Sequence, residues 1–526
     1  MTEVKEIDFK DIKKLISRVE HALEHDLALE SEDIRLILSA IHTLLEVQSK
    51  LEEKDMTLHK LKKLLGMIKK SERRNSSSGN KKNKKRSKKP RTKKAKTNPA
   101  QTSRHAIKNS KIGDPCPVCP KGKLRKKEPL EFIRVTGSTE YSSEKHVLDR
   151  LECDLCDYVV TAEIPKEVIK DGEVGQKYGY SARSMMAIKK HFSGNPYFHQ
   201  ETLNDMFGHP IRASSIFDQC EHVANDTSSA YYELLRQAAN ATLFYIDDTG
   251  NRILDQKPEI RDKRNGKGKV ERKGVYTSGL IALLPSGEVI YLYETSLGHA
   301  GELIDDILLK RKPDLPPPII MCDALSRNLP SVDVDYILLY CNSHARRNFY
   351  DINNHFPEVE EMLDWYEKVW INDDDCKSKG YDPEKRLLYH KEHSLPIMEK
   401  IKAWCQSYID SPEYEEYGGL GKACNYFITH YSELVRFCEV AGAPVDNNTM
   451  EEGLKVPIRT RKNAYFYKTK AGADVANRLT SLICTAHRNG INAFHYLNAL
   501  QRNKEDLRAD PSQWMPWTVK EEALCA

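Results

Sequence analysis

Residues 446–466 read DNNTMEEGLKVPIRTRKNAYF and place acidic, amide and basic side chains close together, late in a chain of 526 residues. Neither a packed core nor a disordered tail accounts for this mixture, because a core excludes unpaired charges and a disordered tail lacks apolar positions. The question is therefore which function requires Glu451 close to a group of cationic and amide side chains: Arg459, Arg461, Lys462 and Asn463.

Two predicted strands farther upstream end in acidic residues. Residues 242–249, TLFYIDDT, are aromatic and β-branched, and strand alternation puts Asp247 on one face and Asp248 on the other. Residues 319–326, IIMCDALS, place Asp323 after four apolar residues and before a predicted loop. An acid at the end of a buried strand is costly unless it binds something, most simply a metal ion or a helix end.

With Glu451, these acids make three separated carboxylates that a sheet could bring together. Magnesium prefers oxygen ligands, and two ions about 3.5–4 Å apart can activate an attacking oxygen and stabilise a leaving oxygen in phosphoryl transfer. The nearby cations would then hold the phosphates of DNA entering the site. Two alternatives stay open: Asn448 and Glu451 have the spacing of a helix capping box, and the basic residues could form a solvated face.

The segments around these acids alternate between strand and helix patterns. Residues 274–295 predict a hairpin, residues 300–311 an amphipathic helix, and residues 334–343 another strand. Residues 352–440 are instead rich in helical patterns, tryptophan and tyrosine, which is typical of an insertion. We therefore expect a mixed α/β core that is interrupted by an all-α insertion and resumes near residue 446.

Two Cys-x-x-Cys pairs precede this core, CPVC at Cys116 and Cys119 and CDLC at Cys153 and Cys156. Two such turns can offer zinc four thiolates in a tetrahedron. The long separation of the pairs predicts a hairpin between them. The alternative is a redox pair or a chance spacing. The other nine of the thirteen cysteines are scattered, as expected of small buried residues.

Residues 196–225 predict a helix, a turn at Gly208 and a second helix. The expected inner face consists of Leu203, Phe207, Ile211 and Ile216. A helix-turn-helix places its second helix in the major groove of DNA, although many helical hairpins bind nothing. DNA contact is therefore one of two open interpretations of this segment.

Residues 31–68 carry an apolar residue every seven positions and a second apolar row three positions farther on. This spacing predicts a coiled coil through which the chain self-associates; the alternative is an amphipathic helix packed on its own domain. The two rows consist of Ile37, Leu44, Leu51, Leu58 and Leu65, and of Ala40, Val47, Leu61 and Ile68, with Lys54 interrupting the second.

The net charge of +5 conceals a basic segment. Residues 69–96 hold fifteen Lys and Arg against one Glu, which is +14 and leaves the rest of the chain at 5 − 14 = −9. Such a segment cannot bury a core and is either a solvated linker or a tether for DNA phosphates. No apolar run has the length of a membrane span or a signal peptide, so we expect a cytoplasmic protein.

These segments, in this order, resemble the insertion-sequence-66 family of bacterial transposases. Residues 446–466 are similar to its signature Asp-Asn-Asn-x-x-Glu followed by Arg-Lys-Asn, although Glu452 and Lys455 stand where arginine is usual and Gly250 where proline is common. Four further segments resemble its first-aspartate strand, second-aspartate segment, His-x-Arg-Arg segment and C-terminal helix: YIDDT at 245–249, MCDALSRN at 321–328, NSHARRNF at 342–349 and SLICTAHRNGINAFHYLNAL at 481–500.

The resemblance implies a ribonuclease-H-like core and an Asp-Asp-Glu mechanism with Mg²⁺ or Mn²⁺, in which the triad falls on Asp247, Asp323 and Glu451. It also implies recognition of the element's terminal repeats by the N-terminal modules, small accessory proteins of the same element, and a nucleoid-associated location. The expected DNA contacts are Arg459, Arg461, Lys462, Asn463, His344, Arg346, Arg347, Lys267 and Lys269.

The sequence thus predicts a multidomain DNA transposase with a structural zinc ion. The rival interpretations are a non-catalytic DNA-binding protein derived from a transposase and an ordinary ribonuclease-H-like nuclease. The predicted segments are a coiled-coil region (1–68), a basic linker (69–105), a zinc module (110–165), a helix-turn-helix with connector (166–240), the first part of the core (241–351), the helical insertion (352–440), the second part of the core (441–500) and a tail (501–526).

Overall fold

The computed structural model describes parts of residues 18–38, and residues 101–525 apart from 120, 137–140 and 263–267. The chain divides into two compact units, residues 1–91 and 92–526. In the first unit, Arg18 forms an ion pair of 2.7 Å with Asp33. The predicted heptad rows beyond Ile37 and the basic segment up to residue 100 lie outside the described residues, so the coiled coil and the linker stay predictions.

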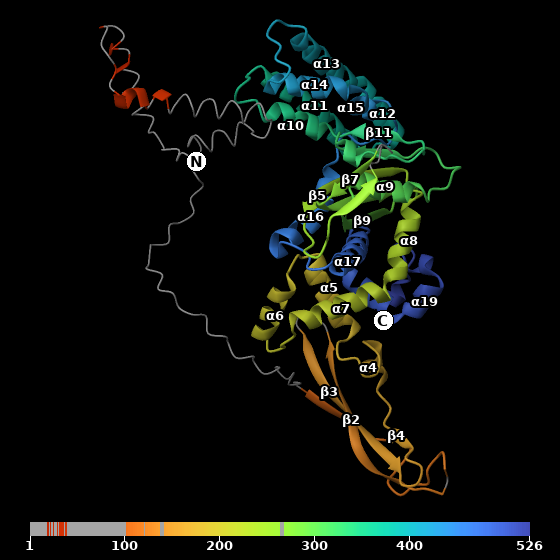
Figure 1. The fold of residues 1–526 in the computed structure, drawn as a ribbon. Coiled ribbons are helices and arrows are strands. Elements are labelled where there is room, and N and C mark those ends of the chain that lie inside the picture. The colour runs from red at the N-terminus through yellow and green to blue at the C-terminus, as the bar shows by residue number, and fades with distance from the viewer. Residues whose placement is uncertain are drawn as a thin grey trace. The chain divides into compact units, whose positions relative to one another are not determined.

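The second unit is organised around a five-stranded mixed sheet (Figure 1). Strand β5 lies at its centre, pairs antiparallel with β8 and parallel with β10, and β8 and β10 in turn pair with the outer strands β9 and β11. The predicted mixed α/β sheet is therefore present. In spatial order, the strands are β11 (Ile337–Tyr340), β10 (Ile319–Cys322), β5 (Leu243–Asn251), β8 (Val275–Leu283) and β9 (Val289–Ser296).

Helices cover both faces of this sheet. One face packs its apolar residues on α8 (Ser228–Ala238) and α9 (Ala300–Leu308). On the other face, α16 (Asn448–Ala464) lies against β8, and a Cβ added at Gly279 would stand 2.3 Å from Cε of Met450. Glycine at this position therefore lets the helix approach the strand closely. The hydroxyl of Tyr293 donates to the carbonyl of Gly453 at 2.8 Å and ties the same helix to β9.

Helix α17 (Lys470–Arg488) closes the outer edge of β9. The backbone N–H groups of residues 289, 291, 293 and 295 donate to side-chain oxygens at 3.0–3.1 Å. Four residues span about 6 Å along a helix, and two residues span about 6.6 Å along a strand. The acceptors on α17 therefore stay aligned with the N–H groups of β9. The edge of the sheet is thereby paired. The accepting residues are Asn489, Thr485, Ser481 and Asn477.

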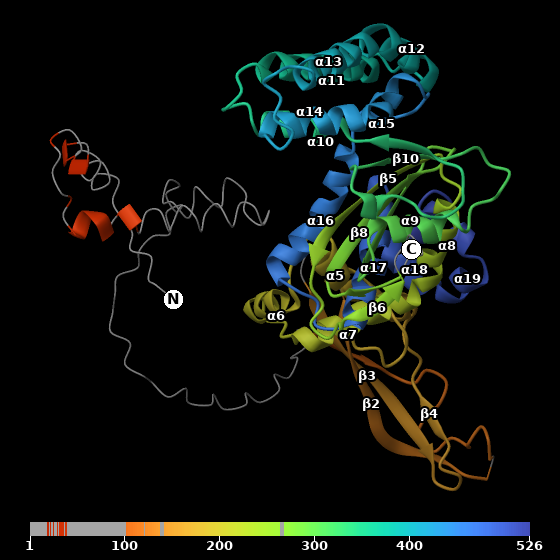
Figure 2. The same cartoon turned by 45° about the horizontal axis from the view of Figure 1, so that its top comes forward.

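The predicted helical insertion is present between β11 and α16 (Figures 1 and 2). Its helices pack on one another and join the same apolar core as the sheet. Helix α10 (Asn342–Tyr350) links it to β11. The insertion itself consists of α11 (Val359–Ser378), α12 (Pro383–His393), α13 (Leu395–Ile409), α14 (Gly419–Thr429), α15 (Tyr431–Val435) and η2 (Arg436–Cys438).

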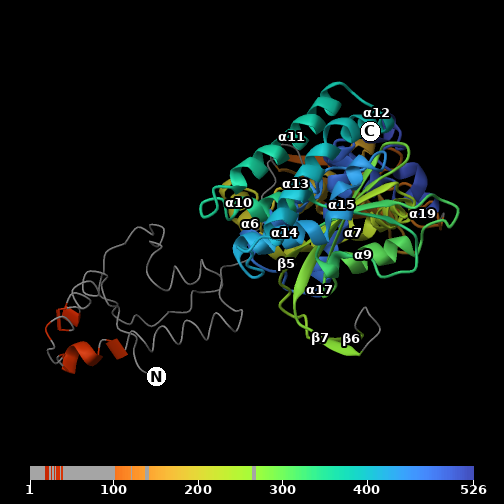
Figure 3. The same cartoon turned by 90° about the horizontal axis from the view of Figure 1, so that it is seen from above.

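A smaller sheet holds the cysteine pairs and extends away from the helices in Figure 1. The residues between the pairs form the predicted hairpin, β2 (Leu124–Thr136) and β3 (Ser142–Cys153), with β4 (Val159–Thr161) beside β3. Strand β1 (Gln101–His105) pairs parallel with β3, so the last five residues of the segment predicted as linker form a strand. A second hairpin, β6 (Glu259–Asp262) and β7 (Lys269–Arg272), projects from the core (Figure 3).

Residues 196–225 form two helices around a turn at Gly208, α6 (Tyr197–Met206) and α7 (Ala213–Asp226). The predicted inner face is wrong in part: Ile211 and Ile216 are buried, but Leu203 and Phe207 are 38% and 57% exposed. The reason is that α7 buries its apolar side with α5 (Tyr180–His191), α17 and α18 (Ala493–Arg502), whereas the buried residues of α6 are Gln200 and Asn204.

The residues after α18 were predicted as a tail but continue as short helical elements. Leu507 and Met515 are fully buried in the main core. The elements are α19 (Lys504–Ala509), η3 (Pro511–Trp514) and α20 (Glu521–Cys525), and α4 (Lys166–Lys170) precedes α5. Eight of the nine scattered cysteines have a described burial, and all eight are buried, as predicted: Cys220, Cys322, Cys341, Cys376, Cys405, Cys424, Cys438 and Cys484.

Closure of the β9 edge by α17 predicts a stability effect at Ser481. Ser481→Ala leaves the buried N–H of Tyr293 without an acceptor, which should lower the free energy of unfolding by about 1–3 kcal/mol. The midpoint of urea-induced unfolding measures this loss. Ser378→Ala is the matched control, because Ser378 is an exposed helical serine and its replacement should change stability by less than about 0.5 kcal/mol. Equal effects of the two substitutions would contradict the prediction.

Candidate active site

The structure brings Asp247 and Asp323 next to each other, although β5 does not end at its acids as predicted but continues to Asn251. Strands β5 and β10 are parallel, and Tyr245 pairs with Met321, so two residues farther on the chains carry Asp247 and Asp323 side by side. Asp323 is 8% exposed, and Asn328 of η1 (Ser326–Asn328) donates to its Oδ1 at 2.6 Å. The side-chain amide therefore orients the second carboxylate from the loop that follows it.

Glu451 reaches the same place from the first turn of α16. The side chain of Asn447, which is fully buried, donates from Nδ2 to the carbonyl of Ile246 at 3.0 Å. Its backbone N–H approaches Sγ of Cys341 at 3.2 Å, at the end of β11. The start of α16 is thus tied to the residue before Asp247, and the helix then presents Glu451 to the two aspartates.

The capping-box alternative does not describe this helix start. The N-cap is Asn447, not Asn448, and no side chain caps the helix. Asn448 instead donates from Nδ2 to Asp446 at 2.8 Å, and Asp446 accepts from Nε1 of Trp370 in the insertion at 2.7 Å. The residues Asp446–Asn448 therefore hold the helix start between β5 and the insertion.

The electrostatics of Asp247 reflect this arrangement. Burial, followed by the negative charge of Asp323, raises the pKa of Asp247 to about 7, and Asp248 and Glu451 add to the shift. One oxygen of Glu451, Oε1, is buried and makes no hydrogen bond. The three acids therefore form a group whose negative charge is incompletely balanced, which favours binding of a cation.

Asp248 lies on the opposite face of the sheet from Asp247, as strand alternation predicts. His299 lies 2.8 Å from one oxygen of Asp248 through Nδ1, and Arg327 lies 3.3 Å from the other through Nη2. Arg327 precedes Asn328, so one short segment after β10 contacts Asp248 through Arg327 and Asp323 through Asn328. Neither His299 nor Arg327 was a predicted site residue, because only the fold places them beside β5.

Helix α10 carries the His-x-Arg-Arg segment next to Glu451. Nε2 of His344 and Nη2 of Arg347 lie 3.9 and 3.6 Å from Oε1 of Glu451. Arg346 instead stacks over the ring of Tyr350 at 5.6 Å from its centroid. Two of these three residues therefore stand at the carboxylate cluster, and the third does not contact it.

The cations after Glu451 differ in their surroundings. Arg459 donates to the carbonyl of Phe192, and Asn463 donates to the carbonyl of Gly194 at 2.9 Å. Arg461 donates to Thr249 at 3.0 Å and to the carbonyl of Gly250. Lys462 is exposed. Three of the four residues predicted to hold DNA thus make contacts within the chain that also fix α16 in place.

Of the two predicted lysines in the projecting hairpin, Lys269 begins β7 and is exposed, whereas Lys267 lies outside the described residues. No helix of the described residues is long and apolar enough to cross a membrane.

The four cysteines of the hairpin module converge at one point. Their sulfur atoms all lie within 4.8 Å of one another, so the group could hold a metal ion. Gly122 makes this approach possible, because a Cβ there would stand 2.2 Å from Sγ of Cys153. The N–H groups of Cys119 and Leu155 point at the sulfurs of Cys116 and Cys153, each at 3.4 Å, as donors to thiolates would.

Comparison with known proteins places this chain in a family. The sequence model of the transposase IS66 family matches residues 175–475, more than half of the chain and all three carboxylates. The chain belongs to the IS66 family of transposases. The fold of this chain is a mixed α/β sheet with many helices, and a four-cysteine group precedes the matched region. The activity of the family is the transposition of DNA.

Two further proteins are similar to this IS66-family chain. Protein y4jD of Sinorhizobium fredii is 28% identical over 162 residues, which cover 30% of this chain and 31% of y4jD, so the chain spans about a third of that relative. The Drosophila P element transposase strand transfer complex is 11% identical, covering 59% of this chain and 93% of that chain. Its TM-score of 0.30 is too low to establish a common fold.

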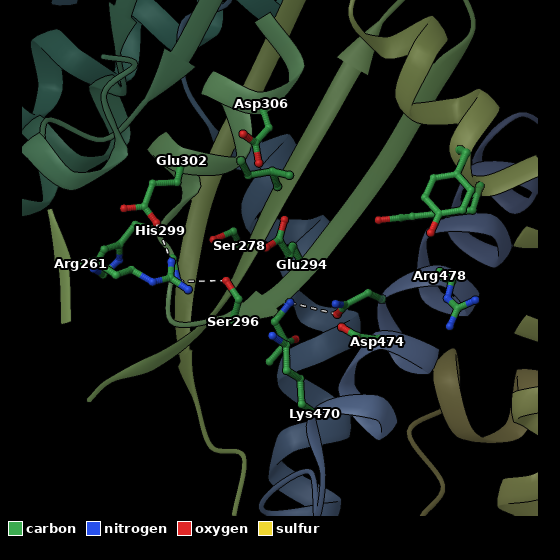
Figure 4. A pocket seen from close by; sticks show the side chains of 16 residues that line it. Arg261, Ser278, Glu294, Ser296, His299, Glu302, Asp306, Lys470, Asp474 and Arg478 are labelled. Atoms are coloured by element: carbon green, nitrogen blue, oxygen red, sulfur yellow. Dashed lines mark hydrogen bonds and ion pairs between the residues drawn. The ribbon is translucent and has the colours of Figure 1, made fainter. Parts of the chain in front are cut away.

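A cavity of about 720 Å³ lies on the Asp248 face of the sheet (Figure 4). Both acidic and basic side chains line it, and Arg261 and Glu302 approach within 3.8 Å of each other. Burial raises the pKa of Glu294 at its floor. None of the three carboxylates lines this cavity, so it is separate from the candidate active site.

The raised pKa of Asp247 predicts a pH-dependent stability of the metal-free IS66-family protein. Asp247 titrates at about 7 when folded, and at about 3.9 when unfolded. Because the folded state holds the proton more tightly, the free energy of unfolding falls as pH rises across this interval. Asp247→Asn removes the effect, so its Tm in EDTA should exceed that of the wild type increasingly toward pH ~8.

Asp364→Asn is the control for this comparison, because Asp364 is exposed on α11. Its Tm difference from the wild type should not change with pH. A Tm difference for Asp247→Asn that is constant from pH ~4 to pH ~8 would show that Asp247 titrates near its ordinary value.

Proposed function

We propose that this chain is a transposase that cuts DNA at the ends of its element and joins the freed strand to target DNA. Asp247, Asp323 and Glu451 would hold two Mg²⁺ or Mn²⁺ ions at the reacting phosphate. The observation that carries the proposal is the convergence of these carboxylates: one within β5, one just after the adjacent parallel strand β10, and one on a helix tied to β5.

We further propose that the core is ribonuclease-H-like. This is supported by the sheet, in which the first three strands along the chain are antiparallel and the last two lie parallel to the first on its other side. In that arrangement the carboxyl end of β10 lies beside the middle of β5. Ligands of α/β sheets commonly bind at the carboxyl ends of strands. Asp323 follows the end of β10, whereas Asp247 lies within β5, two residues beyond its last pairing with β10.

The residues fit a pair of hard divalent ions. All three candidate ligands offer carboxylate oxygens, which such ions prefer. Oε1 of Glu451 is buried without a hydrogen bond, and the pKa of Asp247 is raised by burial and by Asp323, so bound positive charge would stabilise the ionised group. When bound, two ions would activate the attacking oxygen and stabilise the leaving oxygen.

The chain's own residues would orient this chemistry. Asn328 holds Asp323, and Asn447 holds the start of α16 and thereby Glu451. In cleavage, water attacks phosphorus and the bond to the 3′ oxygen breaks; water loses a proton and the 3′ oxygen gains one. In strand transfer, the freed 3′-hydroxyl attacks a target phosphodiester in the same way. Neither step requires an oxidant or a high-energy cofactor.

Three isosteric substitutions test the triad. Asp247→Asn, Asp323→Asn and Glu451→Gln should each reduce Mg²⁺-dependent cleavage of a duplex containing the element's end to background, because each removes a charged ligand. Binding of that duplex should persist. Glu452→Gln is the matched control and should still cleave, because Glu452 points to Arg488 at 2.9 Å and not to the triad.

Two other results would overturn this assignment. Cleavage by Glu451→Gln together with loss of cleavage in Glu452→Gln would mean that the wrong glutamate was chosen. A wild-type protein that binds the duplex but never cleaves it with Mg²⁺ or Mn²⁺ would support the non-catalytic DNA-binding alternative.

We also propose that the four cysteines hold a structural zinc ion, since four thiolates within this distance match its tetrahedral preference. Purified protein should contain about one zinc per chain. Cys116→Ser combined with Cys153→Ser should remove it, as measured by elemental analysis. Cys220→Ser combined with Cys376→Ser, at two buried cysteines outside the group, should keep it. Stoichiometric zinc in the first double variant would end this assignment.

The remaining proposals concern DNA and partners. The N-terminal modules would bind the terminal repeats, and Lys462, Lys269 and the basic segment would contact DNA backbone, since exposed Lys and Arg bind phosphates by counterion release. His344 and Arg347 would position Glu451 and the phosphate. Self-association through the heptad rows, accessory proteins of the element and a nucleoid-associated location complete the proposal.

A further inference from the structure

A cavity of about 270 Å³ lies between α16, α17 and the end of α5. Lys455, Arg459, His487 and Arg488 bring basic groups to it, and Glu452 is the one acid in its lining. The lysine, the two arginines and the glutamate together carry three positive charges and one negative charge, which leaves +2. Aromatic rings support the cations: Arg459 lies 5.9 Å from the ring centre of Phe192, and Arg488 lies 5.7 Å from that of Tyr291.

The cavity lies along a line of exposed cations that follows Glu451 on α16. Lys455, Arg459 and Lys462 stand four, eight and eleven residues after it, and all three are exposed. At about 100° per residue they lie within about 80° of Glu451 around the helix axis. At about 1.5 Å per residue they lie about 6, 12 and 16 Å along it. A DNA strand leaving the three carboxylates along α16 would therefore meet each cation in turn.

The acid in the cavity is held by one of its cations. Glu452 and Arg488 form an ion pair of 2.9 Å in which both side chains are more than one-third exposed. The ion pair lowers the pKa of Glu452, so the group is ionised at neutral pH. An exposed ion pair contributes little stability, so Arg488 can exchange this partner for another anion at low cost.

We propose that this cavity binds a backbone phosphate of the DNA strand that runs from the active site along α16, through Lys455, Arg459 and Arg488. Glu452 occupies the place of that phosphate in the free protein and is displaced from Arg488 when DNA binds. The inference rests on the proposed function, because it requires DNA at the carboxylate cluster. It adds a phosphate site and a residue, Glu452, that weakens phosphate binding at this site.

The chemistry of the cavity favours a phosphodiester over other anions. Planar guanidinium groups bind phosphate oxygens in pairs, and both arginines are already oriented by ring contacts. The open flank carries Lys455, which suits a phosphate that is part of a long strand. A carboxylate ligand would find the same charges, but the line of cations toward Lys462 matches a repeated anion.

The test measures DNA affinity without cleavage. Full-length protein in EDTA is titrated into a fluorescein-labelled duplex of arbitrary sequence, and the Kd is taken from anisotropy at several salt concentrations. Lys455→Ala and Arg488→Gln should each weaken binding by about threefold to tenfold and reduce the slope of log Kd against log salt by about 0.9, the value for one phosphate contact. Glu452→Gln should tighten binding severalfold.

Matched controls separate a local site from the general effect of charge. Lys391→Ala removes an exposed lysine of α12 in the insertion. Glu505→Gln removes an exposed acid that forms an ion pair of 2.8 Å with Arg508 on α19. It is matched to Glu452→Gln, because Glu452 also forms an exposed ion pair with an arginine, Arg488 of α17. Both controls should change the Kd by less than about twofold, since neither charge lies at the proposed contact.

The outcomes distinguish this inference from the proposed function. If Lys455→Ala and Glu452→Gln change the Kd no more than Lys391→Ala and Glu505→Gln, there is no phosphate site in this cavity, even if the wild type cleaves element ends. If the wild type binds no duplex at all, the proposed function fails together with this inference. Weaker binding in Glu452→Gln would show that Glu452 supports the contact and would overturn its proposed role.

Discussion

The hydrogen bond from the side chain of Asn447 to the carbonyl of Ile246 determines most of the candidate active site. It joins the start of α16 to the strand that carries Asp247, across about two hundred residues of chain. Because Asn447 is fully buried, loss of this bond would leave unpaired polar groups in the core. The position of Glu451 relative to the aspartates therefore depends on one amide that makes no contact with the metal or the DNA of the proposed reaction.

Packing on the other side of α16 completes this constraint. Gly279 allows Met450 and Leu454 to lie directly on β8, and the hydroxyl of Tyr293 holds the carbonyl of Gly453. Helix α17 then covers the free edge of β9 with a series of side-chain acceptors. The helical insertion adds the indole of Trp370, which binds Asp446. The mixed-charge segment 446–466 is thus mainly an anchoring segment, with acidic and basic residues on its exposed side.

The adjacent acids illustrate how one fold separates similar side chains. Asp247 and Asp248 are neighbours in sequence, yet one lies among carboxylates and the other between His299 and Arg327. Glu451 and Glu452 diverge in the same way around α16, and Arg488 neutralises the second. Glu452 therefore carries its charge beside a cation of α17, away from the carboxylate cluster.

The sequence by itself determined the parts that depend on local pattern and chemistry. Strand alternation separated Asp247 from Asp248, apolar runs located the core strands, and the spacing of Cys116, Cys119, Cys153 and Cys156 indicated that these four cysteines form a group. Only the tertiary structure decided which partner each polar side chain takes. Arg461 and Asn463 resemble DNA ligands in sequence, but carbonyls far away in the chain, at Gly250 and Gly194, accept their hydrogen bonds. The exposed Leu203 and Phe207 show the same limit, because α7 had other helices to pack against. Such choices depend on contacts between residues far apart in the chain, and no local pattern records them.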